Sequence, residues 1–121
     1  MTEYEKAVKI LSKMIGSLGL DDWEIGIFED TEIEHVAETE IDFPERTAHI
    51  FLNPSHDEYD PNKLRFLMRH ELFHIFLSPI RSLIREIFPA VASEQFNSLL
   101  ASYNFAEETA IGMIERAWRK K

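Results

Sequence analysis

The residues with the clearest chemistry lie at positions 70 to 74, where the sequence reads His70-Glu71-Leu72-Phe73-His74. Imidazole nitrogens are good zinc ligands, and residues four apart on a helix point in directions only about 40° apart. Both histidines can therefore reach one metal ion. Glu71 lies close to them in angle, near enough to act as a base toward water without being a ligand itself. The pattern predicts a zinc site with its own general base.

The residues around this motif predict a mostly buried helix. Asp60-Pro61 is a typical helix start, and the helix is expected to run to about Leu77 and to stop at Ser78-Pro79. Only Arg65 and Arg69 are expected to face water. Buried polar groups need partners, and one metal ion would satisfy the two histidines and the glutamate together. In the alternative, the histidines bond to backbone groups and the glutamate pairs with an arginine.

A catalytic zinc normally has three protein ligands, so a third must come from elsewhere in the chain. After His74 the sequence holds no histidine and no aspartate, which leaves the glutamates. Glu107 is the preferred candidate because it falls on the apolar face predicted for the last helix. Glu108 is the second candidate, although it lies about 100° away on the polar edge with Glu115. Glu107 could instead complete a capping box with Asn104.

The elements that must position these residues follow an α+β order: a helix, three strands, then helices. Helical and alternating periodicity predict the first four at residues 2–18, 23–28, 36–43 and 47–52. After the histidine helix, shorter helices are predicted at 81–88, 93–102 and 104–119, with Pro89 as a break. At 121 residues, the chain is expected to be a single domain, residues 1–121.

Charge and composition exclude several classes of function. The net charge is −9, and the stretch from Asp21 to Glu45 holds eleven acidic residues and no lysine or arginine. Such a stretch repels phosphate backbones, so no nucleic-acid partner is expected. It is either a solvated face or a field that attracts basic peptides or raises the local concentration of cations. No apolar run is long enough to predict a membrane span. Without cysteines or a signal-like start, a cytoplasmic location is expected.

Three strands, a buried His-Glu-x-x-His helix and a later helix with a glutamate make the chain resemble the gluzincins, a group of zinc metallopeptidases. It is most similar to the minigluzincins and to small metallopeptidases of phage and archaeal type. The layout matches over roughly residues 23–118, but only positions 70–74 match a motif closely. Two positions depart from the family pattern: Leu67 replaces the more usual valine or threonine, and Ile111 stands where an aspartate often supports the first histidine.

The resemblance implies hydrolysis of peptide bonds in a peptide or protein substrate. It implies Zn²⁺ held by His70, His74 and Glu107, with Glu71 as the catalytic base. An edge strand near the histidine helix would hold the substrate by strand addition, either residues 48–52 or a neighbouring strand. Some minimal gluzincins are latent, with a terminal segment that covers the active-site cleft. The resemblance therefore also allows that this chain is a zymogen, inactive as isolated. The alternatives are a zinc-binding domain without catalysis and a protein-interaction module whose helix contains two histidines by chance.

Overall fold

The computed structural model describes residues 1–87 and 93–119 and confirms the α+β class. The chain divides into two compact units, Met1–Phe76 and Leu77–Lys121. The prediction of a single domain stays a prediction. In the described residues, no helix combines the length and the apolar character needed to cross a membrane.

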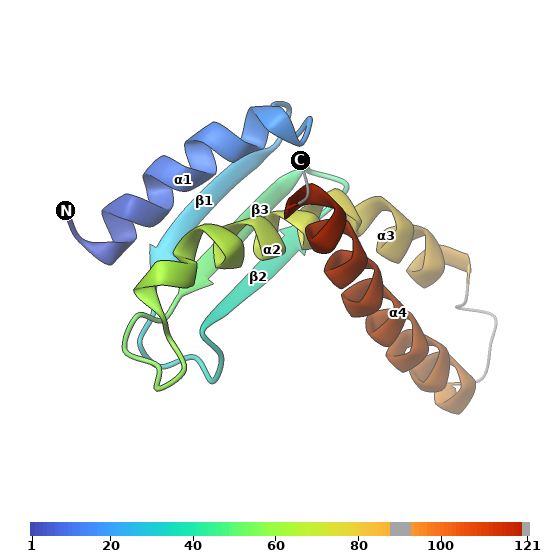
Figure 1. Ribbon diagram of the computed structural model, residues 1–121. Coiled ribbons are helices and arrows are strands. Elements are labelled where there is room, and N and C mark those ends of the chain that lie inside the picture. Colours follow the sequence, from blue (N-terminus) through green and yellow to red (C-terminus); the bar gives the residue numbers. More distant parts are fainter. Residues whose placement is uncertain (88–92, 120–121) are drawn as a thin grey trace. The chain divides into compact units, whose positions relative to one another are not determined.

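The first unit contains one helix, three strands and a second helix, as predicted (Figure 1). Its elements are α1 (Glu3–Ser17), β1 (Glu24–Glu29), β2 (Ala37–Asp42), β3 (Thr47–Leu52), the short 3-10 turn η1 (Pro61–Lys63) and α2 (Leu64–Phe76). The Thr2 hydroxyl caps α1 by accepting from the Glu5 N–H at 3.1 Å. Gly19, with φ 70°, follows the end of α1, in a conformation that suits glycine.

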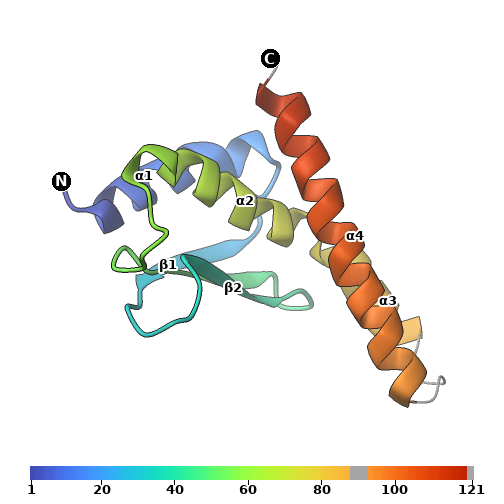
Figure 2. The ribbon, with the colours of Figure 1, turned by 60° about the horizontal axis from the view of Figure 1, so that its bottom comes forward.

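The three strands form one sheet in the order β1-β3-β2. The central strand, β3, runs parallel to β1 and antiparallel to β2. The two helices of this unit, α1 and α2, lie on the same side of the sheet (Figure 2). Alternation along β3 turns Ala48, Ile50 and Leu52 toward these helices, where they are buried.

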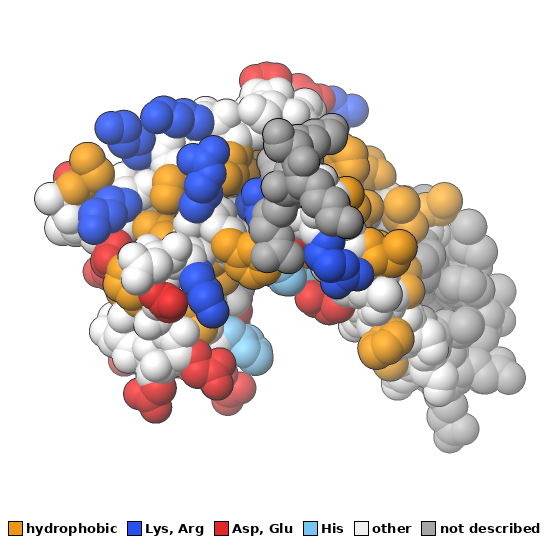
Figure 3. All heavy atoms as spheres, viewed as in Figure 1, with side chains coloured by type: hydrophobic (Ala, Val, Ile, Leu, Met, Phe, Trp, Pro, Cys, Tyr) orange, Lys and Arg blue, Asp and Glu red, His pale blue; other side chains and the backbone are white. Residues whose placement is uncertain are grey.

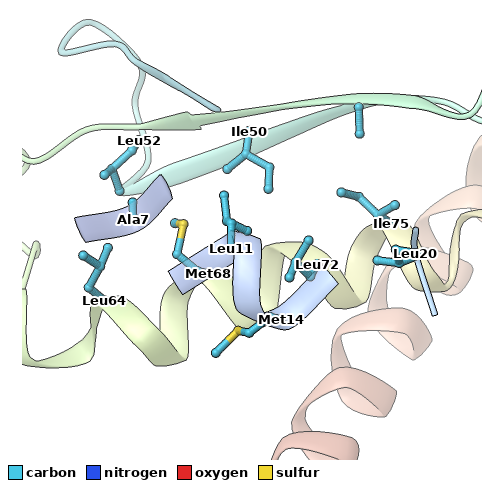
Figure 4. Packing of buried hydrophobic residues seen from close by; sticks show 11 residues of the cluster. Ala7, Leu11, Met14, Leu20, Ile50, Leu52, Leu64, Met68, Leu72 and Ile75 are labelled. Carbon is cyan, nitrogen blue, oxygen red and sulfur yellow. The ribbon is translucent and has the colours of Figure 1, made fainter. Parts of the chain in front are cut away.

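The hydrophobic core of this unit fills the space between the helices and the sheet (Figure 4). Its buried members come from α1, the turn after it, β3 and α2: Ala7, Leu11, Met14, Leu20, Ala48, Ile50, Leu52, Leu64, Met68, Leu72 and Ile75. Four of them come from α2, so the packing of the core fixes the rotation of the helix that carries the histidines.

The second unit contains α3 (Ser78–Ile87) and α4 (Ser93–Arg119), which corrects the prediction in two places. Helix α3 begins at Ser78, earlier than expected, because proline is well tolerated in the first turn of a helix. Helix α4 is continuous where two helices were predicted, since no glycine or proline interrupts it before Gly112. The predicted break at Pro89 lies outside the described residues.

The continuous α4 also rules out the capping box. Asn104 lies inside the helix, and its Oδ1 accepts a hydrogen bond from Arg81 Nη2 at 2.7 Å. An N-cap residue must stand at the first turn of a helix, so Asn104 cannot act as one here. The capping-box alternative for Glu107 was therefore wrong.

Candidate metal centre

Helix α2 brings His70, Glu71 and His74 together as predicted. Each offers a ligand atom, and these atoms all lie within 4.8 Å of one another. The two imidazole rings have centroids 5.0 Å apart and are inclined at 73°. Both histidines are half-buried, whereas Glu71 is only 6% exposed. The group thus combines two accessible imidazoles with one buried carboxylate.

The rotation of α2 explains this difference in burial. The core residues Leu64, Met68, Leu72 and Ile75 form one stripe along the helix. At about 100° per residue, Glu71 lies about 60° from the centre of that stripe. His74 lies about 120° and His70 about 160° from it, on the side of α2 that faces away from the stripe. The same packing that buries the stripe therefore leaves the imidazoles within reach of a ligand.

A residue that the sequence analysis missed holds Glu71 in place. The Thr39 hydroxyl on β2 donates a hydrogen bond to Glu71 Oε1 at 2.6 Å, a short distance typical of hydroxyl donors to carboxylates. Thr39 can do this because it lies opposite the buried Ile50 in the β2–β3 ladder, on the face of the sheet that the helices cover. A hydroxyl among the less polar positions of an alternating strand was the available signal.

Arg69 on α2 is the clear error in the predicted helix. It was expected to face water, but it is 8% exposed. Its guanidinium carbon lies 5.8 Å from the centroid of the Phe66 ring, within the range of a cation–π contact. A long arginine stem packs well against apolar surface, so its position on the helix alone did not determine its exposure.

Glu107 lies on α4 in the second unit and is 4% exposed, as its place on the predicted apolar face implied. Arg81 Nε lies 3.4 Å from its Oε2. Burial raises the pKa of Tyr103 to about 12, and a hydrogen bond with the Glu107 carboxylate contributes to the rise. Glu108 is exposed. Burial therefore distinguishes the two candidate glutamates.

Glu115 was wrongly placed on the polar edge of the last helix. It is 3% exposed and shares a buried stripe with Glu107 and Ile111, each four residues from the next. The remaining histidines show no such grouping. His35 and His49 are exposed, and His56 Nε2 bonds the Glu34 carbonyl oxygen at 2.9 Å. Among the described residues, the group on α2 is the one set of three potential ligands that meets.

The arrangement on α2 suits a metal such as zinc, since neutral imidazoles and a carboxylate are its usual nitrogen and oxygen ligands. A hydroxyl that bonds a carboxylate beside two imidazoles is the kind of contact that orients groups at metal centres. No protein-family model, curated protein or solved structure matches the chain.

Proposed function

We propose that the chain is a zinc-dependent metallopeptidase in which His70 and His74 hold the metal and Glu71 is the general base. One observation carries the proposal: two half-buried imidazoles and a buried carboxylate meet within 4.8 Å on one helix, and Thr39 orients the carboxylate. Two histidines with a purely structural role would not by themselves require a hydroxyl from β2 to hold a glutamate beside them. The resemblance to gluzincins points to the same chemistry.

Glu107 is proposed as the third ligand, which would complete the two-histidine, one-glutamate set of many catalytic zinc sites. It is a buried carboxylate and Glu108 is not, and a ligand gains most from a site that excludes competing water. Glu71 competes for the role, since it also lies within 4.8 Å of both imidazoles. The hydrogen bond from Thr39 favours the role of base for Glu71, because it engages one of the two carboxylate oxygens with the protein.

When bound, zinc would polarise the scissile carbonyl and lower the pKa of a water molecule. Glu71 would accept a proton from that water and return it to the leaving amine nitrogen. Thr39 keeps Oε1 engaged, so the other oxygen, Oε2, is the one assigned to proton transfer. Thr39 is thus a positioning residue, and the half-buried histidines leave the site open to an extended peptide.

The test is metal content by elemental analysis on protein purified without a histidine tag. We expect one zinc per chain in the wild type, loss of zinc in His74→Ala and Glu107→Ala, and retention in the matched control Glu108→Ala. Free zinc at a concentration well above its Kd should raise the unfolding free energy by RT ln(1 + [Zn]/Kd), which is about 2.7 kcal/mol at one hundred times the Kd. A chelator should therefore lower the melting temperature of the wild type and leave His74→Ala unchanged.

The alternatives give different results in the same experiment. A zinc-binding domain without catalysis would keep its zinc yet cleave no member of a peptide library. The Glu71→Gln variant would then match the wild type in zinc content and in its lack of cleavage. A protein-interaction module would hold no zinc even after the metal is added back, and chelator would not affect its stability. The second result would refute the peptidase.

A further inference from the structure

Helices α1 and α2 cover one face of the sheet in the first unit (Figure 2). The opposite face of the sheet is the outer face. The strand register assigns nine residues to it: Glu24, Gly26, Phe28, Glu38, Glu40, Asp42, Thr47, His49 and Phe51. Four carry carboxylates, and none is a lysine or arginine. On the side of the molecule seen in Figure 3, lysine and arginine side chains instead gather over α1 and α2.

The outer face also carries a cluster of aromatic rings. Phe28 stacks on Phe51 with centroids 5.6 Å apart and meets His49 edge-on at 5.3 Å. Phe28 is 45% exposed although it belongs to a strand. A Cβ atom at Gly26 would lie 3.1 Å from the Phe28 ring, so the glycine leaves room for the ring to lie over the sheet. The face therefore presents flat apolar surface to solvent.

Acidic side chains border this cluster along β2. Glu38 lies opposite Phe51 and Glu40 opposite His49 in the β2–β3 ladder. Side chains directly opposite in such a ladder lie about 4.5–5.5 Å apart at their Cβ atoms, so each carboxylate stands beside a ring. Lysine and arginine suit this combination, since their apolar stems can pack on rings while their charged heads meet carboxylates.

The free edge of β2 runs past the candidate base. In the described residues β2 pairs with β3 alone, so its other edge offers backbone groups to an added strand. Thr39, in the middle of β2, bonds Glu71. A peptide paired with β2 would turn alternate side chains toward the helix side and the rest toward the outer face. Those on the outer face would stand beside Glu38 and Glu40.

We infer that the β2 edge and the outer face together bind extended peptides with lysine or arginine at alternate positions. The inference rests on the proposed function, because it names the substrate class of that site. Basic side chains two residues apart are separated by about 6.6–6.8 Å, which matches the spacing of Glu38 and Glu40 along β2. Their stems lie toward Phe51 and His49.

The first test measures binding to the metal-free protein by calorimetry, so that no cleavage intervenes. The probes are ten-residue peptides of alternating lysine and threonine, and the same peptides with glutamate in place of lysine. We expect the lysine peptide to bind and the glutamate peptide not to. Each facing ion pair should contribute about threefold, so Glu38→Gln/Glu40→Gln should weaken binding about tenfold.

The matched control is Glu32→Gln/Glu34→Gln, which removes the same charge from exposed positions in the loop before β2. We expect less than a twofold change there. Equal losses in both double variants would show that the whole acidic stretch attracts peptides through its field, and would overturn the assignment to this face. Binding of the lysine and glutamate peptides alike would overturn it too.

Cleavage by the zinc-loaded protein separates the inference from the function on which it rests. If lysine peptides bind the metal-free protein but the zinc-loaded protein cleaves neither them nor any other peptide, the peptidase is refuted. The proposed binding surface would remain intact. Cleavage at equal rates whatever the charge at these positions would keep the peptidase and refute the basic specificity. Preferred cleavage beside alternate lysines, lost in Glu38→Gln/Glu40→Gln, is the expected outcome.

Discussion

The hydrogen bond from Thr39 to Glu71 gives the sharpest test of how the candidate site is held. Thr39→Val removes the hydroxyl and keeps a β-branched side chain of similar volume on β2. The bond is 2.6 Å long and ends on a carboxylate that is 6% exposed. Hydrogen bonds to charged groups contribute about 1.5–3 kcal/mol. Because Thr39 is only half-buried and water can partly replace it, we expect a loss of about 1.5 kcal/mol.

The assay is urea unfolding of the metal-free protein, with Thr39→Ser as the control that keeps the hydroxyl. With an m-value of about 1.5 kcal/mol/M, the valine variant should unfold at about 1 M lower urea than the wild type. The zinc-loaded protein gives a second measurement. Since the Thr39 hydroxyl bonds Glu71, which is proposed as the base and not as a ligand, zinc affinity should stay unchanged. The value of kcat/KM should fall by about tenfold, as expected for a base held less firmly.

Two outcomes would contradict this reasoning. If Thr39→Val matched the wild type in both stability and rate, the hydroxyl would contribute nothing, and β2 would not position Glu71. If the valine and serine variants lost equal stability, the effect would come from packing rather than from the bond. A drop in zinc affinity in the valine variant would show that Glu71 is a ligand and not the base.

The second unit and the α1 terminus yield two more predictions. Tyr103 has a pKa of about 12 because of burial and its bond with Glu107, so its neutral form stabilises the fold fully below about pH 10, and that contribution is lost as pH rises from 10 to 12. Burial also raises the pKa of Tyr59 to about 12, so ultraviolet titration should show two late-ionising tyrosines, of which Tyr103→Phe removes one. A normal pKa for Tyr103 would rule out the contact. Gly19→Ala should cost about 1–2 kcal/mol in unfolding free energy because φ is 70°, whereas Gly16→Ala should gain about 0.5–1 kcal/mol inside α1. Equal effects of the two alanines in thermal unfolding would contradict the backbone argument.

The strands and α1 could be predicted because local patterns determine them. The alternation of Ala48, Ile50 and Leu52 defines both the limits of β3 and its buried face, and the structure has the strand at 47–52 as predicted. Thr2 and Gly19 likewise mark the two ends of α1 through capping and a positive φ. Each signal lies within a few residues of the feature that it predicts.

The errors occur where tertiary packing overrides local pattern. Arg69 was assigned to water from its charge, yet its stem is buried beside Phe66. Glu115 was assigned to the polar edge of its helix, yet it is buried in line with Glu107. Asn104 resembled a helix cap, but its side chain bonds Arg81 from within α4. Helical periodicity gives the angle of a side chain around the helix axis. It does not show how deeply neighbouring elements bury that side chain.

The same distinction divides the candidate site. His70 and His74 could be recognised because one turn of helix separates them, so the spacing itself carries the geometry. Thr39 lies 32 residues before Glu71 and reaches it only because the β2–β3 register and the packing of α2 agree. The proposed third ligand likewise belongs to a different element, and helical spacing favoured Glu107 over Glu108 only by placing it on the apolar face of the last helix. Burial separates them, since Glu107 is enclosed and Glu108 is exposed. If Glu108→Ala rather than Glu107→Ala lost zinc, burial would have been the wrong criterion for a ligand in this chain.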